Sequence, residues 1–165
     1  MKHKWILPVT AAITLLATLC MIFILFMGSA SNEKAAFTPP PFESTAISGT
    51  PSVDTKLGWS QIAQDGMGFS AHICGNVIVK GDSADIYFTN NEENTVWMKL
   101  RILSETGEIL GETGILKPNE YIRSVKFTTV PKNGEKIKLK IMAYQPKTYY
   151  SEGSVSLNTA VTVGG

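Results

Sequence analysis

Residues 5–27 of this chain contain no charged side chain. About 20 consecutive apolar residues, folded as a helix, cross the roughly 30 Å hydrocarbon core of a bilayer. Because the run reaches that length, we predict a transmembrane helix here and regard the lipid bilayer as the first partner of the chain. Pro8 is compatible with this helix, since proline is tolerated in the first turn.

The charges around this segment predict its orientation. Lys2, His3 and Lys4 precede it, and the next basic residue is Lys34. Positive flanks stay in the cytoplasm, so we expect the N-terminus inside the cell and the rest of the chain outside. The apolar region of a signal peptide runs about 7 to 15 residues, and the greater length here favours an uncleaved, single-pass signal anchor in the cell membrane. Secretion after cleavage near Ala30, which ends a stretch of small residues, is the alternative.

Residues 31–56 read as a linker. They hold four of the eight prolines and many Ser and Thr residues, without a sustained apolar period. The three prolines at 39–41 favour an extended geometry of about 3.1 Å per residue. The predicted organisation is a cytoplasmic tip and anchor at 1–30, the linker at 31–56, and an extracellular domain at 57–165.

Beyond the linker, apolar residues recur with a period of two, which is typical of half-buried strands. Turn-forming residues separate the alternating segments. About seven strands at such short spacing indicate an all-β fold, an immunoglobulin-like antiparallel sandwich. Residues 61–66 are expected to form a short helical turn or an irregular segment. The expected strands are 71–80, 84–89, 96–103, 108–114, 121–128, 136–143 and 154–163. The expected core residues are Ile86, Phe88, Met98, Leu100, Ile102, Leu139, Ile141, Leu157 and Val161.

Residues 90–163 carry a further pattern. Its parts are an Asn-rich turn (Asn90, Asn91, Asn94), a strand at 96–103, a short hairpin at Glu105-Thr106-Gly107-Glu108, the turn Leu116-Lys117-Pro118-Asn119-Glu120-Tyr121-Ile122, then Tyr144, Thr148 and a final strand at 154–163. This resembles the C-terminal pattern of small, single-span, exported proteins of Gram-positive bacteria. Asn119 stands where such proteins usually have glycine, and both residues tolerate a positive φ. The resemblance implies a membrane-tethered extracellular β-sandwich, and it brings no catalytic residues.

Catalytic chemistry has little support in the sequence. His3 and His72 are the two histidines, and His3 lies in the cytoplasmic tip. His72 and Cys74 would share one face of a strand, and with Met67 they are weak candidates for a soft-metal site. The competing interpretation is a hydrogen-bonded histidine beside a small buried cysteine. We therefore expect no enzyme and no cofactor.

Composition removes other classes of function. The net charge of +1 does not indicate a nucleic-acid-binding protein. Two cysteines are too few for a disulfide-rich scaffold or a four-cysteine zinc site.

Charge is unevenly distributed along the predicted domain. Lys136, Lys138 and Lys140 must share one face of a strand whose other face is apolar, about 6.6 Å apart. On the strand at 96–103, Trp97 would face outward beside Lys99 and Arg101. We predict that these six residues form a binding face, most simply for another protein of the cell envelope. A lysine row that only keeps the sheet soluble, and a Trp97 covered by a loop, are the competing interpretations. Binding of an anionic envelope polymer or a soft metal ion is the alternative function.

Overall fold

The computed structural model describes residues 37–63, 66 and 68–164, together with residues 15–16, 18–21 and 23. The chain divides into two units, Met1–Thr38 and Pro39–Gly165. In the first unit the described residues 15–16, 18–21 and 23 are helical. Within the described part of the chain, no helix combines the length and the apolar character that a membrane span requires. Most of the predicted span at 5–27, and Ala30, lie outside the described residues.

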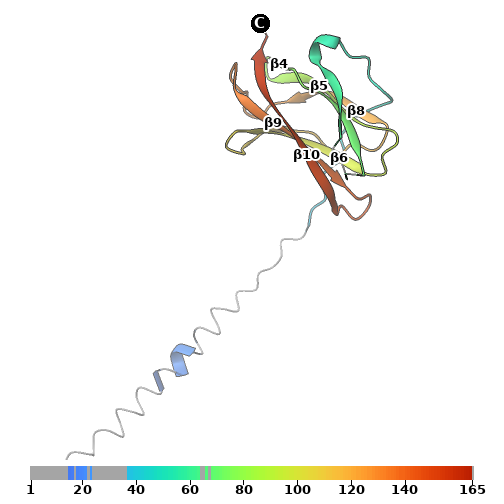
Figure 1. Cartoon of the computed structure of the whole chain (residues 1–165). Helices are drawn as coiled ribbons and strands as arrows, with labels where there is room; N and C mark the ends of the chain where they lie inside the picture. The colour runs from blue at the N-terminus through green and yellow to red at the C-terminus, as the bar shows by residue number, and fades with distance from the viewer. Residues whose placement is uncertain are drawn as a thin grey trace, which may run out of the picture. The chain divides into compact units, whose positions relative to one another are not determined.

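The second unit is built from strands, which confirms the all-β prediction (Figure 1). In its described part there are ten strands and one short 3₁₀ helix, η1 (Thr55–Leu57). The predicted strand at 71–80 is two strands, since Gly75 and Asn76 form a bend in the middle. The strands are β1 (Ile47–Ser48), β2 (Trp59–Ala63), β3 (Ser70–Cys74), β4 (Val77–Lys80), β5 (Ser83–Asn90), β6 (Trp97–Ser104), β7 (Ile109–Glu112), β8 (Glu120–Lys126), β9 (Lys136–Tyr144) and β10 (Ser151–Val163).

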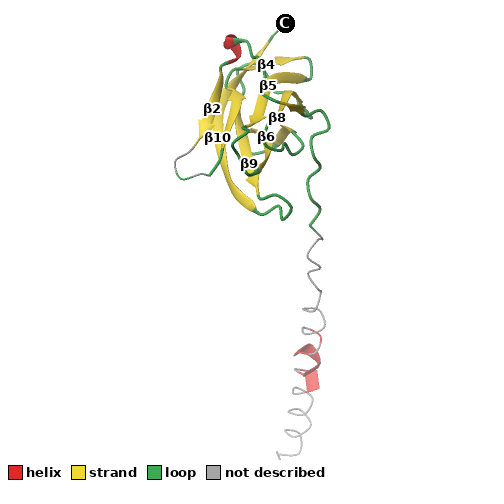
Figure 2. Cartoon of the chain, turned by 90° about the vertical axis from the view of Figure 1, so that its right-hand side faces the viewer, coloured by secondary structure: helices red, strands yellow, loops and turns green. Residues whose placement is uncertain are grey.

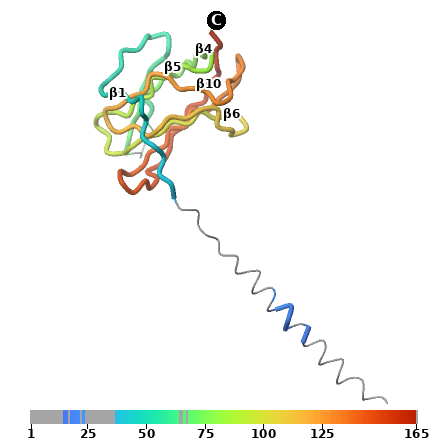
Figure 3. The backbone as a smooth tube through the Cα atoms, turned by 180° about the vertical axis from the view of Figure 1, so that it is seen from behind, coloured from blue at the N-terminus to red at the C-terminus, as the bar shows by residue number. Residues whose placement is uncertain are grey.

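The strands form one curled sheet in the order β1-β8-β5-β4-β10-β9-β6-β7, with β3 paired to β5 and β2 paired to β3. β10 joins the two halves of the sheet (Figure 2). Its first part runs antiparallel to β9, from Ser151 to Ala160, and its last part runs parallel to β4, with Val161 opposite Val77. Figure 3 shows the curled sheet from behind. The half-barrel that results is compatible with a sandwich-like fold.

The apolar side chains of the alternating strands fill the space between the two halves of the sheet. Of the expected core residues, Ile86, Phe88, Met98, Leu100, Ile102, Leu139, Ile141 and Val161 are buried. Leu157 is only partly buried and packs against this cluster. It lies on the part of β10 that pairs with β9 alone, so one side of the strand has no paired neighbour there.

Residues 61–63 are not helical but belong to β2, which corrects the expectation for 61–66. β2 pairs with β3 along its whole length, from Trp59 opposite Cys74 to Ala63 opposite Ser70. Ile62 packs against the core. The helical spacing of Trp59 and Ile62 was misleading, because Trp59 takes the outer face of the strand and Ile62 the inner one.

The second half of the predicted linker at 31–56 belongs to the compact unit. Glu43 N–H donates to Ile115 O at 2.9 Å, and Ile115 N–H donates to Pro41 O at 2.9 Å. The Glu43 carboxylate also accepts from Gly114 N–H at 2.8 Å. Burial alone would raise the pKa of Glu43, but the hydrogen bonds from Thr45 and Gly114 hold the pKa below its usual value. A proline-rich composition did not reveal these contacts, because they are made by the backbone and by one carboxylate.

Candidate functional site

The predicted binding residues lie on the outer face of β6 and β9, which we call the β6–β9 face. The register places Trp97 opposite Tyr144, Lys99 opposite Met142, and Arg101 opposite Lys140. The structure therefore brings the predicted residues onto one surface. It divides them into three parts with different surroundings: a neutralised centre, a lysine row and an aromatic cluster.

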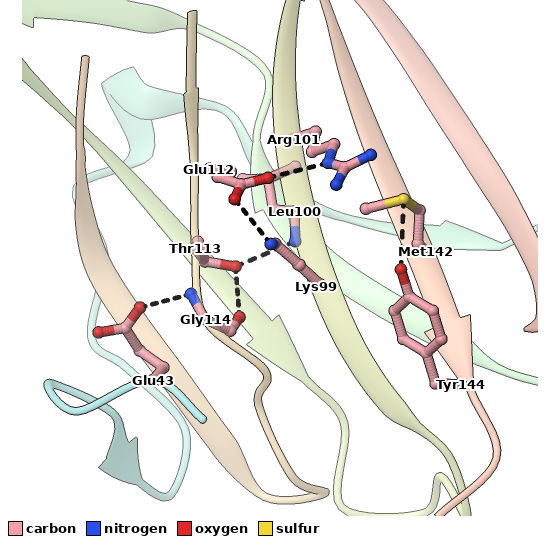
Figure 4. Close-up of polar contacts among 9 residues, drawn as sticks. All are labelled: Glu43, Lys99, Leu100, Arg101, Glu112, Thr113, Gly114, Met142 and Tyr144. Carbon is pink, nitrogen blue, oxygen red and sulfur yellow. Dashed lines mark hydrogen bonds and ion pairs between the residues drawn. The ribbon is translucent and has the colours of Figure 1, made fainter. Parts of the chain in front are cut away.

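The centre of the face is an ion-pair cluster (Figure 4). Glu112 of β7 lies between Lys99 and Arg101, with Lys99 Nζ 2.8 Å and Arg101 Nε 2.9 Å from its two carboxylate oxygens. Burial would raise the pKa of Glu112, but the hydrogen bonds and charges of Lys99 and Arg101 lower it below the usual value. Lys99 was expected to face solvent, yet it is only 5% exposed. These two cations are therefore already paired and give the face little free charge.

The lysine row on β9 does carry free charge. Lys136 and Lys138 are exposed, and Lys140 is partly exposed. Lys136 Nζ lies 3.8 Å from Glu105, whereas Lys138 and Lys140 make no ion pair with the described residues. On β10, Asn158 lies opposite Lys138 and Ser156 opposite Lys140. A hollow of about 440 Å³ opens beside Lys136, Lys138 and Asn158.

The aromatic cluster occupies the other end of the face. Trp97 contacts Phe42 edge to face, with ring centroids 4.8 Å apart, and Tyr149 with centroids 5.3 Å apart. Lys117 Nζ lies 4.9 Å from the centre of the Phe42 ring, which is a cation–π distance. Trp97 is thus partly covered by two segments, one from before β1 and one from the β9–β10 loop, while Phe42 remains 41% exposed. Contacts within the chain therefore hold the cluster together.

The soft-metal candidates are less well placed. His72 and Cys74 alternate with the buried Ala71 and Ile73, so both belong to the outer face of β3. Cys74 is nevertheless fully buried. Burial and the nearby Asp85 raise the pKa of its thiol to about 12, so the metal-binding thiolate is scarce at neutral pH. Within the described residues there is no group of three His, Cys, Asp or Glu side chains arranged for a metal, and Met67 lies outside them.

Several residues that shape the site were not found from the sequence. Glu112 follows a short apolar segment like many solvated acids, and only the register of β6 against β7 places it between two cations. Phe42 directly follows the three prolines, and nothing in that composition indicated that its ring packs against Trp97. The contact of Tyr149 with Trp97 depends on the shape of the β9–β10 loop.

The comparisons with known proteins add little. No protein-family profile and no curated protein matches this sequence. A solved structure, CopC from Methylosinus trichosporium OB3b, is 13% identical, with a TM-score of 0.35 over 55% of this chain and 87% of that one. A likeness at this level supports no inference about fold or function.

Proposed function

We propose that this chain is a non-catalytic binding module of a cell-envelope assembly. Residues 5–27 anchor it in the membrane with the N-terminus in the cytoplasm, as in small single-span exported proteins of Gram-positive bacteria. The β unit is an immunoglobulin-like sandwich that stands outside the cell and presents the β6–β9 face to a protein partner. The proposed orientation of the chain in the membrane rests on the basic residues Lys2 and Lys4, which precede the apolar run.

One observation carries the choice of face: an aromatic cluster with an exposed Phe42 lies at one end of it, and toward the other end Lys138 and Lys140 have no ion-pair partner among the described residues. Aromatic residues are enriched in protein interfaces, where they bury large area at a small cost in conformational entropy. Here Phe42, Trp97 and Tyr149 already pack against one another, so little order has to be gained on binding. Lys138 and Lys140 then favour a partner with acidic side chains next to an apolar patch.

Photo-crosslinking in intact cells tests the proposal. A photo-reactive residue is placed at Asn158, which is exposed and lies opposite Lys138 on this face. The matched control is the exposed Ser124 on β8, in the other half of the sheet. We expect one discrete protein adduct from Asn158 and none from Ser124, and we expect Lys138→Glu with Lys140→Glu to abolish it. Equal labelling from both positions, or no protein adduct at Asn158, contradicts the proposal.

An anionic envelope polymer is the second candidate, and the unpaired Lys138 and Lys140 favour it. Binding that is driven by a charge row falls steeply with salt concentration, whereas binding centred on aromatic side chains does not. If the ligand is an anionic polymer, the full chain should dissociate from purified cell walls as the salt concentration rises. Replacing the three lysines of the row with glutamine should cause the same loss of binding at low salt.

A further inference from the structure

A second surface feature lies in the other half of the sheet, on the outer face of β2, β3 and β5. It is a half-open pocket of about 430 Å³, which we call the Trp59 pocket. That volume falls in the range of small-molecule sites in proteins. Its lining includes two ring-bearing residues, Trp59 and His72, which we call the aromatic wall, and four polar residues, Gln61, Glu92, Glu93 and Asn119, which we call the rim.

Contacts within the fold hold the aromatic wall of the pocket in place. The rings of Trp59 and His72 stack with centroids 4.4 Å apart and planes 22° apart. The indole N–H of Trp59 donates to the carbonyl oxygen of Tyr87 at 3.0 Å. Tyr87 lies in the irregularity where β5 slips against β8, and its φ is 47°. A bulky residue in that region of backbone space is strained, and bulges of this kind often re-aim side chains at binding sites.

The side of the pocket next to His72 is fixed by an amide network. His72 Nδ1 lies 2.7 Å from Asn91 Oδ1, and Asn91 Nδ2 donates to Ser70 Oγ at 2.6 Å. Asn94 Nδ2 donates to Ser70 O and to Asn90 Oδ1, which ties the 91–96 loop to β3 and β5. Because Asn91 Oδ1 can only accept, His72 Nδ1 carries the hydrogen. In the neutral ring Nε2 is then left as an acceptor.

The rim, in contrast, offers polar groups that the fold does not use. Gln61, Glu92, Glu93 and Asn119 line the pocket, and their side chains make no hydrogen bond or ion pair with the described residues. Two of the four are carboxylates, and no lysine or arginine is among the described lining residues. The pocket thus combines a rigid aromatic wall, free amides and negative charge.

We propose that the Trp59 pocket binds a sugar ring that carries a free amino group. The flat C–H face of a sugar ring packs on an aromatic side chain, and its hydroxyl groups pair with amides that both donate and accept. Glu92 and Glu93 supply the anionic partners for an ammonium group and disfavour a phosphate or a uronic acid. This site is separate from the β6–β9 face and does not rest on the function proposed for it.

The test compares two probes that differ at one group: the tetramer of glucosamine and the tetramer of N-acetylglucosamine. Each is titrated into the full chain in mild detergent at neutral pH and low salt, by calorimetry. Glu92→Gln with Glu93→Gln removes two exposed charges from the rim. The matched control, Glu108→Gln with Glu152→Gln, removes two exposed charges elsewhere. Gln61→Ala tests the shared hydroxyl contacts.

We expect the glucosamine tetramer to bind more tightly than the acetylated one. Loss of the two rim carboxylates should weaken its binding by about tenfold, with no change in the control variant. Gln61→Ala should weaken the binding of both tetramers. The proposal is overturned if neither tetramer binds at millimolar concentration, if the acetylated tetramer binds as tightly, or if the rim and control variants behave alike.

Discussion

The buried Lys99 makes Glu112 the most informative position for the stability of the β6–β9 face. In Glu112→Gln, the carboxylate that neutralises Lys99 becomes a neutral amide, while the Lys99 side chain stays 6% exposed. Removing one partner of a fully buried ion pair costs about 3 to 5 kcal/mol. The Glu112 side chain is 38% exposed, and glutamine keeps one oxygen that can accept from Lys99. We therefore expect the free energy of unfolding to fall by about 2 kcal/mol.

Urea unfolding of the full chain in mild detergent, followed by tryptophan fluorescence, measures this loss. Arg101→Gln is the matched control, because the Arg101 side chain is 39% exposed and an exposed pair contributes about 0 to 1 kcal/mol. Adding Lys99→Met to Glu112→Gln removes the stranded cation and should restore most of the lost stability. Equal stability of Glu112→Gln and the wild type at neutral pH would refute the reasoning, as would a Lys99→Met change that lowers stability further.

The effect has a defined pH dependence. The pKa of Glu112 is lowered in the folded protein from the ordinary value of 4.5. The stability contributed by its charge is therefore fully present above pH 4.5 and is lost as the pH falls through the folded value. The gap between the wild type and Glu112→Gln should be constant from pH 7 to about pH 5 and should narrow in more acidic solution. A gap that widens with acid would show that another group causes it.

Two further predictions concern other parts of the unit. A β-carbon at Gly114 would lie 2.5 Å from Glu43 N. Gly114→Ala should therefore displace residues 41–43 and lower the free energy of unfolding by about 1 to 3 kcal/mol. The control in the same unfolding assay is Gly68→Ala, where a β-carbon meets no atom within 4 Å. In a Cys20→Ser background, iodoacetamide should alkylate Cys74 at pH 8 only after urea unfolds the chain, because the thiol is fully buried and burial raises its pKa to about 12; rapid alkylation of the folded protein would contradict this.

The sequence predicted the strands and the core better than the site, for physical reasons. Apolar alternation depends on which face of a strand is buried, and that is a local property, so Leu100 and Ile141 were placed correctly. The positive φ that was allowed for Asn119 is also observed, at 64°. In both cases the residue type and its immediate neighbours contain the information.

Contacts between segments that are far apart in the chain could not be predicted from the sequence. Lys99 is buried because β7 returns beside β6 in the register that brings Glu112 to it. Trp97 is covered because Phe42 and Tyr149 reach it from segments that are far apart in the chain. The indole N–H of Trp59 has a hydrogen-bond acceptor because the irregularity of β5 places the carbonyl oxygen of Tyr87 within reach. None of these contacts has a periodic signal, since each depends on strand register or loop shape.

The two surfaces are separated by the way the sheet curls. Both halves turn their inner faces toward one hydrophobic core, so the β6–β9 face and the Trp59 pocket point away from each other. They also differ in charge: the lysine row leaves Lys138 and Lys140 without an acidic partner among the described residues, and the pocket has Glu92 and Glu93 on its rim. An acidic ligand is attracted to the first surface and repelled from the second, and an amine-bearing ligand meets the reverse. One such unit therefore presents two surfaces of different charge, one on each side of its core.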